Sequence, residues 1–317
     1  AVLAIPVTIA VALILVPLLV KTLDRKAGWP LGLTFLALAG YVIKHADPIL
    51  NGKTATWSVT WIQGFLTGAG GAAGTAGNAN SGALDLALKM DSLGLFFTLL
   101  ALLIGAVVFI YSAAYLHKGD KIMSFYVLMT SFMLAVLLLV LADDVALLFI
   151  GWELVSLASF FLIARSGSGG EAGSIRTLLL TFVGGLFLLA ALGIGVITTG
   201  TTNLTAMLHS PAWEGQDVRL AIVAVLIALA AFSKAAQIPF HFWLPEAMAA
   251  DTPVSAFLHA AAVVKAGVYL LLRFSGLFEG VMAWHTLLIV IGMTTAIMAA
   301  VFAVQKTDLK KLTAYST

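Results

Sequence analysis

Apolar runs of about 20 residues recur along most of the chain, and they constrain its fold more than any other feature. A helix needs roughly 20 apolar residues to cross the hydrocarbon core of a bilayer. Of the 317 residues, 61% are hydrophobic and only 10% are charged, whereas a soluble domain carries about 25% charged residues. The sequence therefore predicts an all-α polytopic membrane protein.

We expect nine spans, and a tenth that has barely begun at Thr317. The nine predicted spans cover residues 2–20, 29–46, 92–116, 122–141, 144–164, 175–198, 218–248, 254–274 and 283–304. Because the sequence starts at Ala1 rather than Met and stops within a span, we expect it to be part of a longer chain. Lys21, Arg25 and Lys26 follow the first run, an order that suits a retained span rather than a cleaved signal peptide.

Positive charges predict the orientation of these spans. Of the 17 Lys and Arg residues, ten fall in connections on one side, namely Lys21, Arg25, Lys26, Lys118, Lys121, Arg165, Arg176, Lys306, Lys310 and Lys311. Five fall on the other side, and Lys234 and Lys265 lie within predicted spans. Because cytoplasmic loops carry the excess of Lys and Arg, we expect the N-terminus to lie outside.

The connection over residues 47–90 is the only sizeable aqueous piece that we predict. Residues 56–62 and 83–88 alternate between polar and apolar types, as strands do. Residues 67–82 between them are almost entirely Gly, Ala, Thr and Asn, the composition of a flexible linker. We expect a small external hairpin with a mobile tip, and a disordered loop without a specific role is the alternative.

Three charged residues are predicted near the middle of the bilayer, where an ionisable side chain costs about 2.5–3.5 kcal/mol. Glu153 lies nine residues beyond Asp144, which is about 13–14 Å along a helix. Lys265 lies twelve residues beyond Pro253, about 18 Å by the same rise. Lys234 is in the middle of the seventh span. We expect the three side chains to form a lateral polar layer inside the bundle.

A structural ion pair, for instance Glu153 with Lys234, is the simpler interpretation of this layer. Two lysines compete for one glutamate, however, so one lysine must be neutral, pair outside the chain or change partner. Burial favours the neutral form of a lysine, and a nearby carboxylate favours the charged form. A lysine that approaches and leaves a carboxylate can therefore switch a proton, which predicts movement of protons or small cations across the membrane.

Pro239 and Pro245 interrupt the seventh span just after Lys234. Pro239 has no N–H, so the carbonyl of Ala235 loses its helical partner. Broken helices at membrane depth line cavities or meet other protein groups, and they mark ion sites in transporters. His241 follows the first proline. A kink that only shapes packing is the alternative role of the prolines.

The remaining candidates are two histidines and two acids. His259 lies six residues before Lys265, about 240° away around a continuous helix, so the two do not form a narrow stripe. Histidine relays protons readily near neutral pH, and a satisfied interior histidine is the alternative for His259 and His241. Asp143 and Asp144 stand at the start of a span, where a solvated helix cap is the simpler role.

Other classes of chemistry lack support in the sequence. There is no cysteine, which excludes thiolate-ligated iron–sulfur clusters and disulfides in this chain. No metal cluster, nucleophile elbow, phosphate loop or dinucleotide fingerprint is present. No basic stripe outside short loops indicates a nucleic-acid partner. We expect no metal and no cofactor.

The runs 238–248, 252–259 and 264–269 closely resemble a known family. They are similar to the proton-translocating subunits shared by respiratory complex I and the Mrp-type multisubunit cation/proton antiporters. Gly151-Trp-Glu153 and residues 308–317 match further family segments. Phe-His-Phe-Trp-Leu-Pro combined with Val-Lys-Ala-Gly most resembles the large A subunits of the sodium/proton antiporters. The resemblance covers most of the chain from Asp91 onward.

The resemblance implies two inverted five-helix repeats, each with a broken helix. An N-terminal three-helix segment would occupy 1–121, the first repeat 122–274, and the start of the second repeat 275–317. The resemblance also implies the roles of single residues. Glu153 would be the acidic partner of a central protonatable Lys234, and Lys265 with His259 would be the onward relay.

Asp251 departs from the family pattern, which usually has proline there, and it adds an acid near the lysine route.

We therefore expect a proton-translocating subunit of a multisubunit Na⁺/proton antiporter, with other membrane subunits as partners, in a prokaryotic cell (inner) membrane. We expect no chemical reaction, so the chain would not be an enzyme. The alternative is a proton-pumping membrane subunit of a redox-driven complex, of the complex I or membrane hydrogenase type. A non-transporting scaffold is a third class, and it predicts that neutralising Lys234 or Lys265 harms assembly but not turnover.

Overall fold

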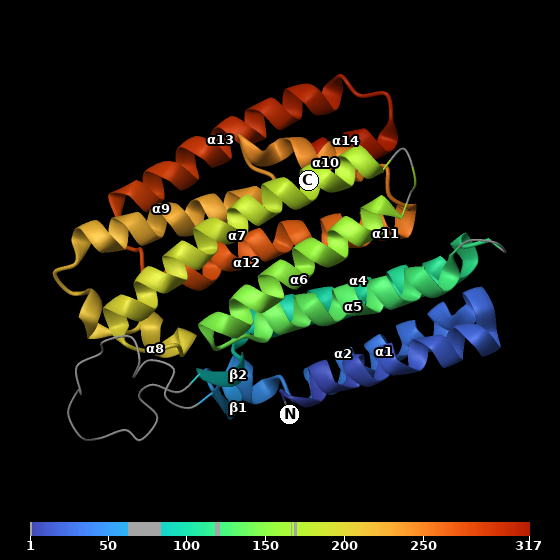
Figure 1. The fold of residues 1–317 in the computed structure, drawn as a ribbon, viewed down its shortest axis with the longest axis horizontal. Coiled ribbons are helices and arrows are strands. Elements are labelled where there is room, and N and C mark those ends of the chain that lie inside the picture. Colours follow the sequence, from blue (N-terminus) through green and yellow to red (C-terminus); the bar gives the residue numbers. More distant parts are fainter. Residues whose placement is uncertain (1, 63–83, 118–120, 166, 168–169) are drawn as a thin grey trace.

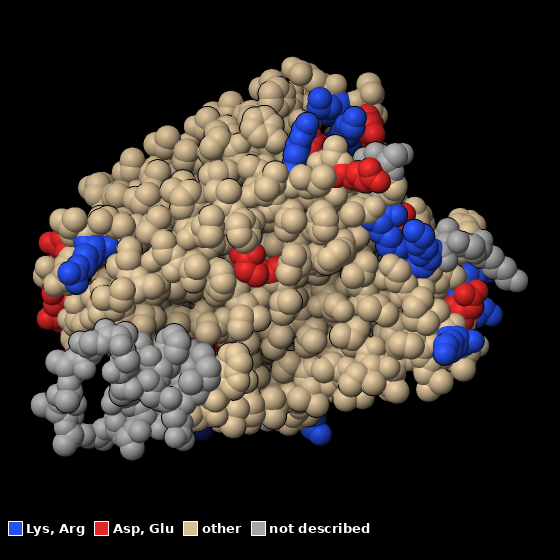
Figure 2. Space-filling view, viewed as in Figure 1, with Lys and Arg blue, Asp and Glu red and all other residues tan. Residues whose placement is uncertain are grey.

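A computed structural model describes residues 2–62, 84–117, 121–165, 167 and 170–317 of the chain. Its long helices lie side by side and run between two ends of the molecule (Figure 1). The hairpin end carries strands β1 (Ala55–Ile62) and β2 (Leu84–Met90). We call the opposite end, where Lys and Arg side chains gather, the basic end (Figure 2).

Helices make up most of the described chain. In chain order they are α1 (Ala4–Leu23), η1 (Asp24–Ala27), α2 (Gly28–Lys44), α3 (Asp47–Leu50), α4 (Ser92–Tyr115), α5 (Ile122–Leu141), α6 (Val145–Ala164), α7 (Glu171–Thr199), α8 (Leu204–Leu208), η3 (Pro211–Trp213), α9 (Asp217–Lys234), η4 (Phe240–Phe242), α10 (Trp243–Ala247), α11 (Thr252–Ala260), α12 (Val263–Phe274), α13 (Met282–Val304) and α14 (Leu309–Ser316).

The prediction of an all-α polytopic membrane protein is confirmed. Seven helical stretches are long and apolar enough to cross a membrane, and the first of them contains both α1 and α2. Helix α9, with 18 residues that include Lys234, supplies the remaining predicted span. The flank between the two ends is almost entirely uncharged in Figure 2, as a lipid-facing surface requires.

Neighbouring helices pack in a simple order across the bundle. The pair α1 and α2 lies against α4 and α5, which are followed by α6, α7 and α9, with α13 on the far side (Figure 1). Helix α12 packs against α9, α5 and α6, near the middle of this arrangement. The order places the ends of the broken segments inside the bundle.

The predicted hairpin is confirmed. Strands β1 and β2 pair antiparallel, with an irregularity between Thr60 and Ile62. The hairpin is tied to the bundle because the N–H of Asp143 donates to the carbonyl of Ala87 at 2.9 Å. The predicted tip, 67–82, lies outside the described residues.

The seventh predicted span, 218–248, is not one kinked helix. Helix α9 ends at Lys234, before Pro239, and Ala236 adopts the left-handed conformation with φ of 52°. The chain continues through η4 into the short helix α10. The helix ends earlier than the proline alone requires, because a left-handed residue already turns the chain away from the helix axis.

The eighth predicted span also divides, and our expectation of a continuous helix over 254–274 is wrong. Helix α11 ends at Ala260, and α12 begins at Val263. Between them Ala262 has φ of −113° and ψ of −98°, outside the helical region. The 240° separation calculated for His259 and Lys265 therefore does not apply. No Gly or Pro marks this break, so the sequence gives no local signal for it.

Candidate ion-translocation site

Lys234 is the last residue of α9, and its side chain is completely buried. Its Nζ donates a hydrogen bond to the main-chain carbonyl of Trp152 on α6. The same Nζ lies 4.3 Å from the centroid of the Trp152 indole ring, a distance at which a cation is attracted to the aromatic face. Helix α6 thus supplies both a neutral acceptor and an aromatic face to the lysine.

Glu153 follows Trp152 directly and is half-buried. Within the described part of the chain, no ion pair of 4.0 Å or less joins Glu153 to Lys234, so the structural ion pair that was the simpler interpretation is not formed. The Oε1 atom of Glu153 is buried without a hydrogen-bond partner. Buried carboxylate oxygens without partners are costly, so this atom is a candidate for taking up a proton, a water molecule or a cation.

Two glycines of α7 make room for these side chains. A Cβ atom at Gly185 would overlap the Glu153 carboxylate, and one at Gly184 would overlap the hydroxyl of Ser233, beside Lys234. Close helix packing explains both glycines, as their sequence context indicates. Figure 2 shows an isolated acidic spot halfway along the flank, over α6 and α7.

The carbonyl groups freed at the end of α9 find partners within the break. The Gln237 N–H donates to the carbonyl of Phe232 at 2.9 Å, and the Gln237 side chain donates to that of Ala235 at 3.1 Å. The indole N–H of buried Trp243, on α10, donates to the carbonyl of Ser233 at 2.9 Å. These bonds satisfy main-chain acceptors that a broken helix in lipid cannot leave unpaired.

The break after α9 opens on a cavity of about 630 Å³ that α10, α13 and α14 also line. Gln237 and His241 line it, together with Thr295 of α13. Thr295 accepts a hydrogen bond from the Ile238 N–H at 3.1 Å. The Nδ1 atom of His241 is buried without a hydrogen-bond partner. The structure thus places His241 beside the break, on the wall of a space large enough for several water molecules.

The second break carries the other two candidates. His259 is the penultimate residue of α11, and both of its ring nitrogens are buried without hydrogen-bond partners. Among the described residues, no protein group hydrogen-bonds to the His259 ring. Lys265 is the third residue of α12. A Cβ atom at Gly267 would overlap the carbonyl of Ala231, so α12 packs closely on the last turn of α9, which ends at Lys234.

Asp143 and Asp144 precede α6 at the hairpin end of the bundle, whereas the two breaks follow α9 and α11. Asp144 caps α6, accepting from the Ala146 N–H at 2.8 Å, but it is only 1% exposed, so the expectation of a solvated cap is wrong. Burial raises the pKa of Asp144, although the capping N–H groups oppose this shift. Asp143 accepts hydrogen bonds from Asn203 and Thr205.

Asp251 and Glu246 hold the segment around α10 at the basic end. Asp251 pairs with Arg165 at 2.8 Å, and Glu246 pairs with Arg176. Lys310 donates to the carbonyl of Ala250 at 2.9 Å. The partner that the structure gives Asp251 is therefore an arginine, and neither relay lysine forms an ion pair of 4.0 Å or less with it in the described chain.

Sequence reasoning did not predict the contacts of three residues of this site. Trp152 supplies the carbonyl and ring that contact Lys234, and Gln237 and Trp243 satisfy the end of α9. Trp152 is adjacent to Glu153 in the sequence, but a main-chain contact across 82 residues leaves no local signal. Among the described residues, no group of three or more His, Asp or Glu side chains is arranged to hold a metal ion.

Comparison with known proteins identifies the family. Residues 142–317 match the family described as NADH:quinone oxidoreductase/Mrp antiporter, TM. The chain belongs to this family. Residues 78–126 also match the family described as NADH-Ubiquinone oxidoreductase (complex I), chain 5 N-terminus. The resemblance stated from the sequence motifs is confirmed.

Relatives within the family include antiporter subunits. The chain is 32% identical to the putative antiporter subunit mnhA2 of Staphylococcus haemolyticus over 96% of its own length and 36% of the relative's. It is 39% identical to the mnhA2 subunit of Staphylococcus aureus over 74% of its length and 30% of the relative's.

A solved structure shares the fold. One chain in the structure of the Mrp complex from Dietzia sp. DQ12-45-1b is 47% identical, with a TM-score of 0.87. The match covers 98% of the chain described here and 32% of the Dietzia chain. The chain thus spans about a third of the length of the relatives that it matches.

Proposed function

We propose that the chain is part of a proton-translocating subunit of a multisubunit Na⁺/proton antiporter. The observation that carries the proposal is the buried Lys234 at the end of a broken helix, with its Nζ on the carbonyl of the residue before Glu153. The antiporter relatives and the Mrp complex favour this function over a redox-driven pump. No chemical reaction is part of the proposal.

The proposed relay runs laterally through the bundle. Glu153 and Lys234 exchange a proton as the ammonium moves between the Trp152 carbonyl and the carboxylate. Lys265 and His259, on the two halves of the second broken span, continue the route. Glu153 and His259 each have a buried atom without a hydrogen-bond partner among the described residues, so a proton or water molecule taken up there displaces no existing protein bond.

His241 connects the relay to water in this proposal. It lines the cavity at the first break, so protons can reach Lys234 from that cavity. The excess of Lys and Arg in alternate connections favours a cytoplasmic basic end and an outside N-terminus. The antiporter would lie in a prokaryotic cell (inner) membrane with other membrane subunits as partners.

We propose a division of the chain into three segments that follows the family resemblance. Residues 1–121 would form an N-terminal segment, 122–274 the first antiporter-like repeat, and 275–317 the start of the second. The two broken helices both lie within the proposed first repeat.

Inverted membrane vesicles that contain the complete complex test the proposal. A proton gradient is imposed, sodium is added, and collapse of the gradient is followed with a pH-sensitive dye. We expect sodium to collapse the gradient in the wild type, and Lys234→Ala and Lys265→Ala to abolish this response at equal assembly. Lys44→Ala, at the exposed end of α2, is the matched control and should respond normally.

Two other outcomes would contradict the proposal. A wild type that ignores sodium but builds a gradient from an electron donor would identify a redox-driven pump. Normal sodium response in both lysine variants, assembled to the wild-type level, would exclude the lysine relay.

A further inference from the structure

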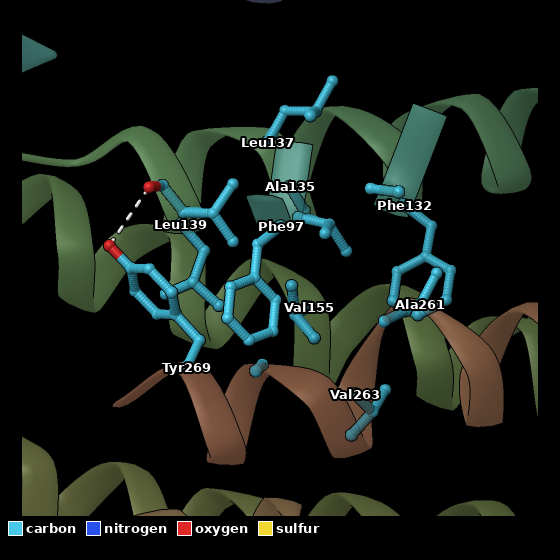
Figure 3. Packing of buried hydrophobic residues seen from close by; sticks show 14 of the residues in the cluster. Phe97, Phe132, Ala135, Leu137, Leu139, Val155, Ala261, Val263 and Tyr269 are labelled. Carbon is cyan, nitrogen blue, oxygen red and sulfur yellow. Dashed lines mark hydrogen bonds between the residues drawn. The ribbon is translucent and has the colours of Figure 1, made fainter. Parts of the chain in front are cut away.

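A second cluster of charged and polar groups, which the proposed relay does not use, lies at the hairpin end of α12. Arg273 donates from Nη2 to Oδ1 of Asp91 at 3.1 Å, and its Nη1 donates to Oδ2 of the same carboxylate. Its Nε donates to the Tyr269 hydroxyl at 3.0 Å. The Tyr269 hydroxyl donates to the main-chain carbonyl of Val140 at 3.1 Å (Figure 3). We call Asp91, Tyr269 and Arg273 the outer cluster.

The outer cluster lies on the same stripe of α12 as Lys265. Lys265, Tyr269 and Arg273 are spaced by four residues each, and residues four apart on a helix are neighbours on one face. Each step is about 6 Å along the helix axis. Tyr269 and Arg273 therefore occupy the stretch of helix surface between Lys265 and the hairpin end.

Neighbouring helices fix the cluster from several sides. Asp91 also caps α4, since its Oδ1 accepts the Gly94 N–H at 2.9 Å. The Tyr269 ring makes an edge contact with Phe97 of α4, with centroids 5.4 Å apart (Figure 3). Lys89 of β2 lies 3.8 Å from the same Asp91 carboxylate. The cluster thus joins α4, α5, α12 and the hairpin.

The cluster is almost closed to water. The Tyr269 side chain is fully buried, and the side chains of Arg273 and Asp91 are 11% and 21% exposed. Burial alone would raise the pKa of Asp91, but hydrogen bonding to Arg273 and its charge outweigh burial and hold that pKa below its ordinary value. An arginine is charged at all accessible pH values. The stripe therefore ends in a mostly buried ion pair in which Nε, Nη1 and Nη2 of the guanidinium all donate hydrogen bonds.

We propose that Asp91, Tyr269 and Arg273 form a plug that closes the hairpin end of the route through Lys265. The inference rests on the proposed function, because it concerns the insulation of the proposed relay. The polar groups of this packed cluster bond one another, so they do not hold the chain of water molecules that would carry a proton past Tyr269. Asp91 holds the guanidinium in place, so it acts as a positioning residue for the plug.

The test measures proton leak without sodium. The complete complex that contains the chain is reconstituted in liposomes, a pH gradient is imposed, and its passive decay is followed with a trapped dye. We expect Asp91→Asn to accelerate the decay several-fold, because asparagine keeps the helix cap but loses the charge that anchors Arg273. Asp91→Glu, which restores a carboxylate, should return the decay toward the wild-type rate.

Two further variants keep the inference falsifiable. Tyr269→Phe retains the ring against Phe97 and removes the hydroxyl, so it should also leak. Glu279→Gln, an exposed carboxylate at the same end, should not leak. A wild-type decay rate in assembled Asp91→Asn and Tyr269→Phe complexes would overturn the plug, even if their melting temperatures fall. Sodium-coupled transport is measured separately in the same liposomes, so failure of the antiport function remains distinguishable from failure of the plug.

Discussion

The ammonium of Lys234 donates to the main-chain carbonyl of Trp152, one residue before the Glu153 carboxylate. A main-chain carbonyl cannot titrate, so it remains available as an acceptor whether or not Glu153 carries a proton. The nearby carboxylate, whose Oε1 is buried without a partner, offers the lysine an alternative. Two competing acceptors for one ammonium are what a proton switch requires. Three predictions test this switch and the two helix breaks, and a fourth tests the buried cap of α6.

Gly185→Ala should slow transport strongly with only a moderate loss of stability. The new methyl group would overlap the Glu153 carboxylate and force it away from its position. Overpacking of this kind costs typically about 1–3 kcal/mol. Gly193→Ala, on the same helix with no atom within 4 Å of its added Cβ, is the control. Sodium-dependent proton flux should fall in the first variant alone, and equal flux in both would contradict the role of Glu153.

Ala236→Gly should stabilise the protein slightly. A left-handed alanine costs roughly 1–2 kcal/mol, and glycine relieves that cost at an entropic penalty of about 0.5–1 kcal/mol. Ala236 has φ of 52°, whereas Ala235 has φ of −75°. Ala235→Gly should therefore be destabilising, and the two variants are compared by thermal melting of the purified complex in detergent. A lower melting temperature for Ala236→Gly than for the wild type would contradict the conformation at the break.

His259→Leu should retain stability and lose transport. Both ring nitrogens of His259 are buried without partners, and removing buried polar groups that lack partners is neutral or stabilising. A histidine that only holds the structure together would show the opposite result, a large loss of stability. Melting temperature and sodium-dependent proton flux of the same preparation separate the two roles.

Asp144→Asn should stabilise the protein near neutral pH and lose this advantage in acid. Burial raises the pKa of Asp144 in the folded protein, so folding favours the protonated carboxyl. The stability gained in this way is fully present below the unfolded pKa of about 3.9. The contribution disappears as the pH rises through the folded pKa, which leaves a buried charge. Asparagine caps a helix as well as aspartate does.

Melting temperatures measured from pH 7 to pH 4 check the Asp144 prediction. The difference between the variant and the wild type should shrink as the pH falls. Asp144→Ala, which loses the cap, should be less stable than Asp144→Asn by about 1 kcal/mol at every pH, because neither variant titrates at this position. If the difference in melting temperature between Asp144→Asn and the wild type grew as the pH fell, the direction of the pKa shift of Asp144 would be contradicted.

The apolar runs determined the spans by themselves, because a lipid environment requires about 20 apolar residues to pair their main-chain groups within one helix. The alternation in 56–62 and 83–88 likewise predicted the hairpin. Pro239 predicted a break in the span just after Lys234. Glu153, Lys234 and Lys265 were identified as candidates because charged side chains are costly in lipid. These features depend on residue type and spacing alone.

Tertiary structure decided the rest. The break between α11 and α12 lies among three alanines, so only packing around them separates the two helices. The Trp152 carbonyl meets Lys234 because α6 and α9 are neighbours in space, and every residue has a carbonyl. The pairing of Asp91 with Arg273 joins residues 182 positions apart. Such contacts depend on how helices are arranged, and short-range sequence patterns carry no information about that arrangement.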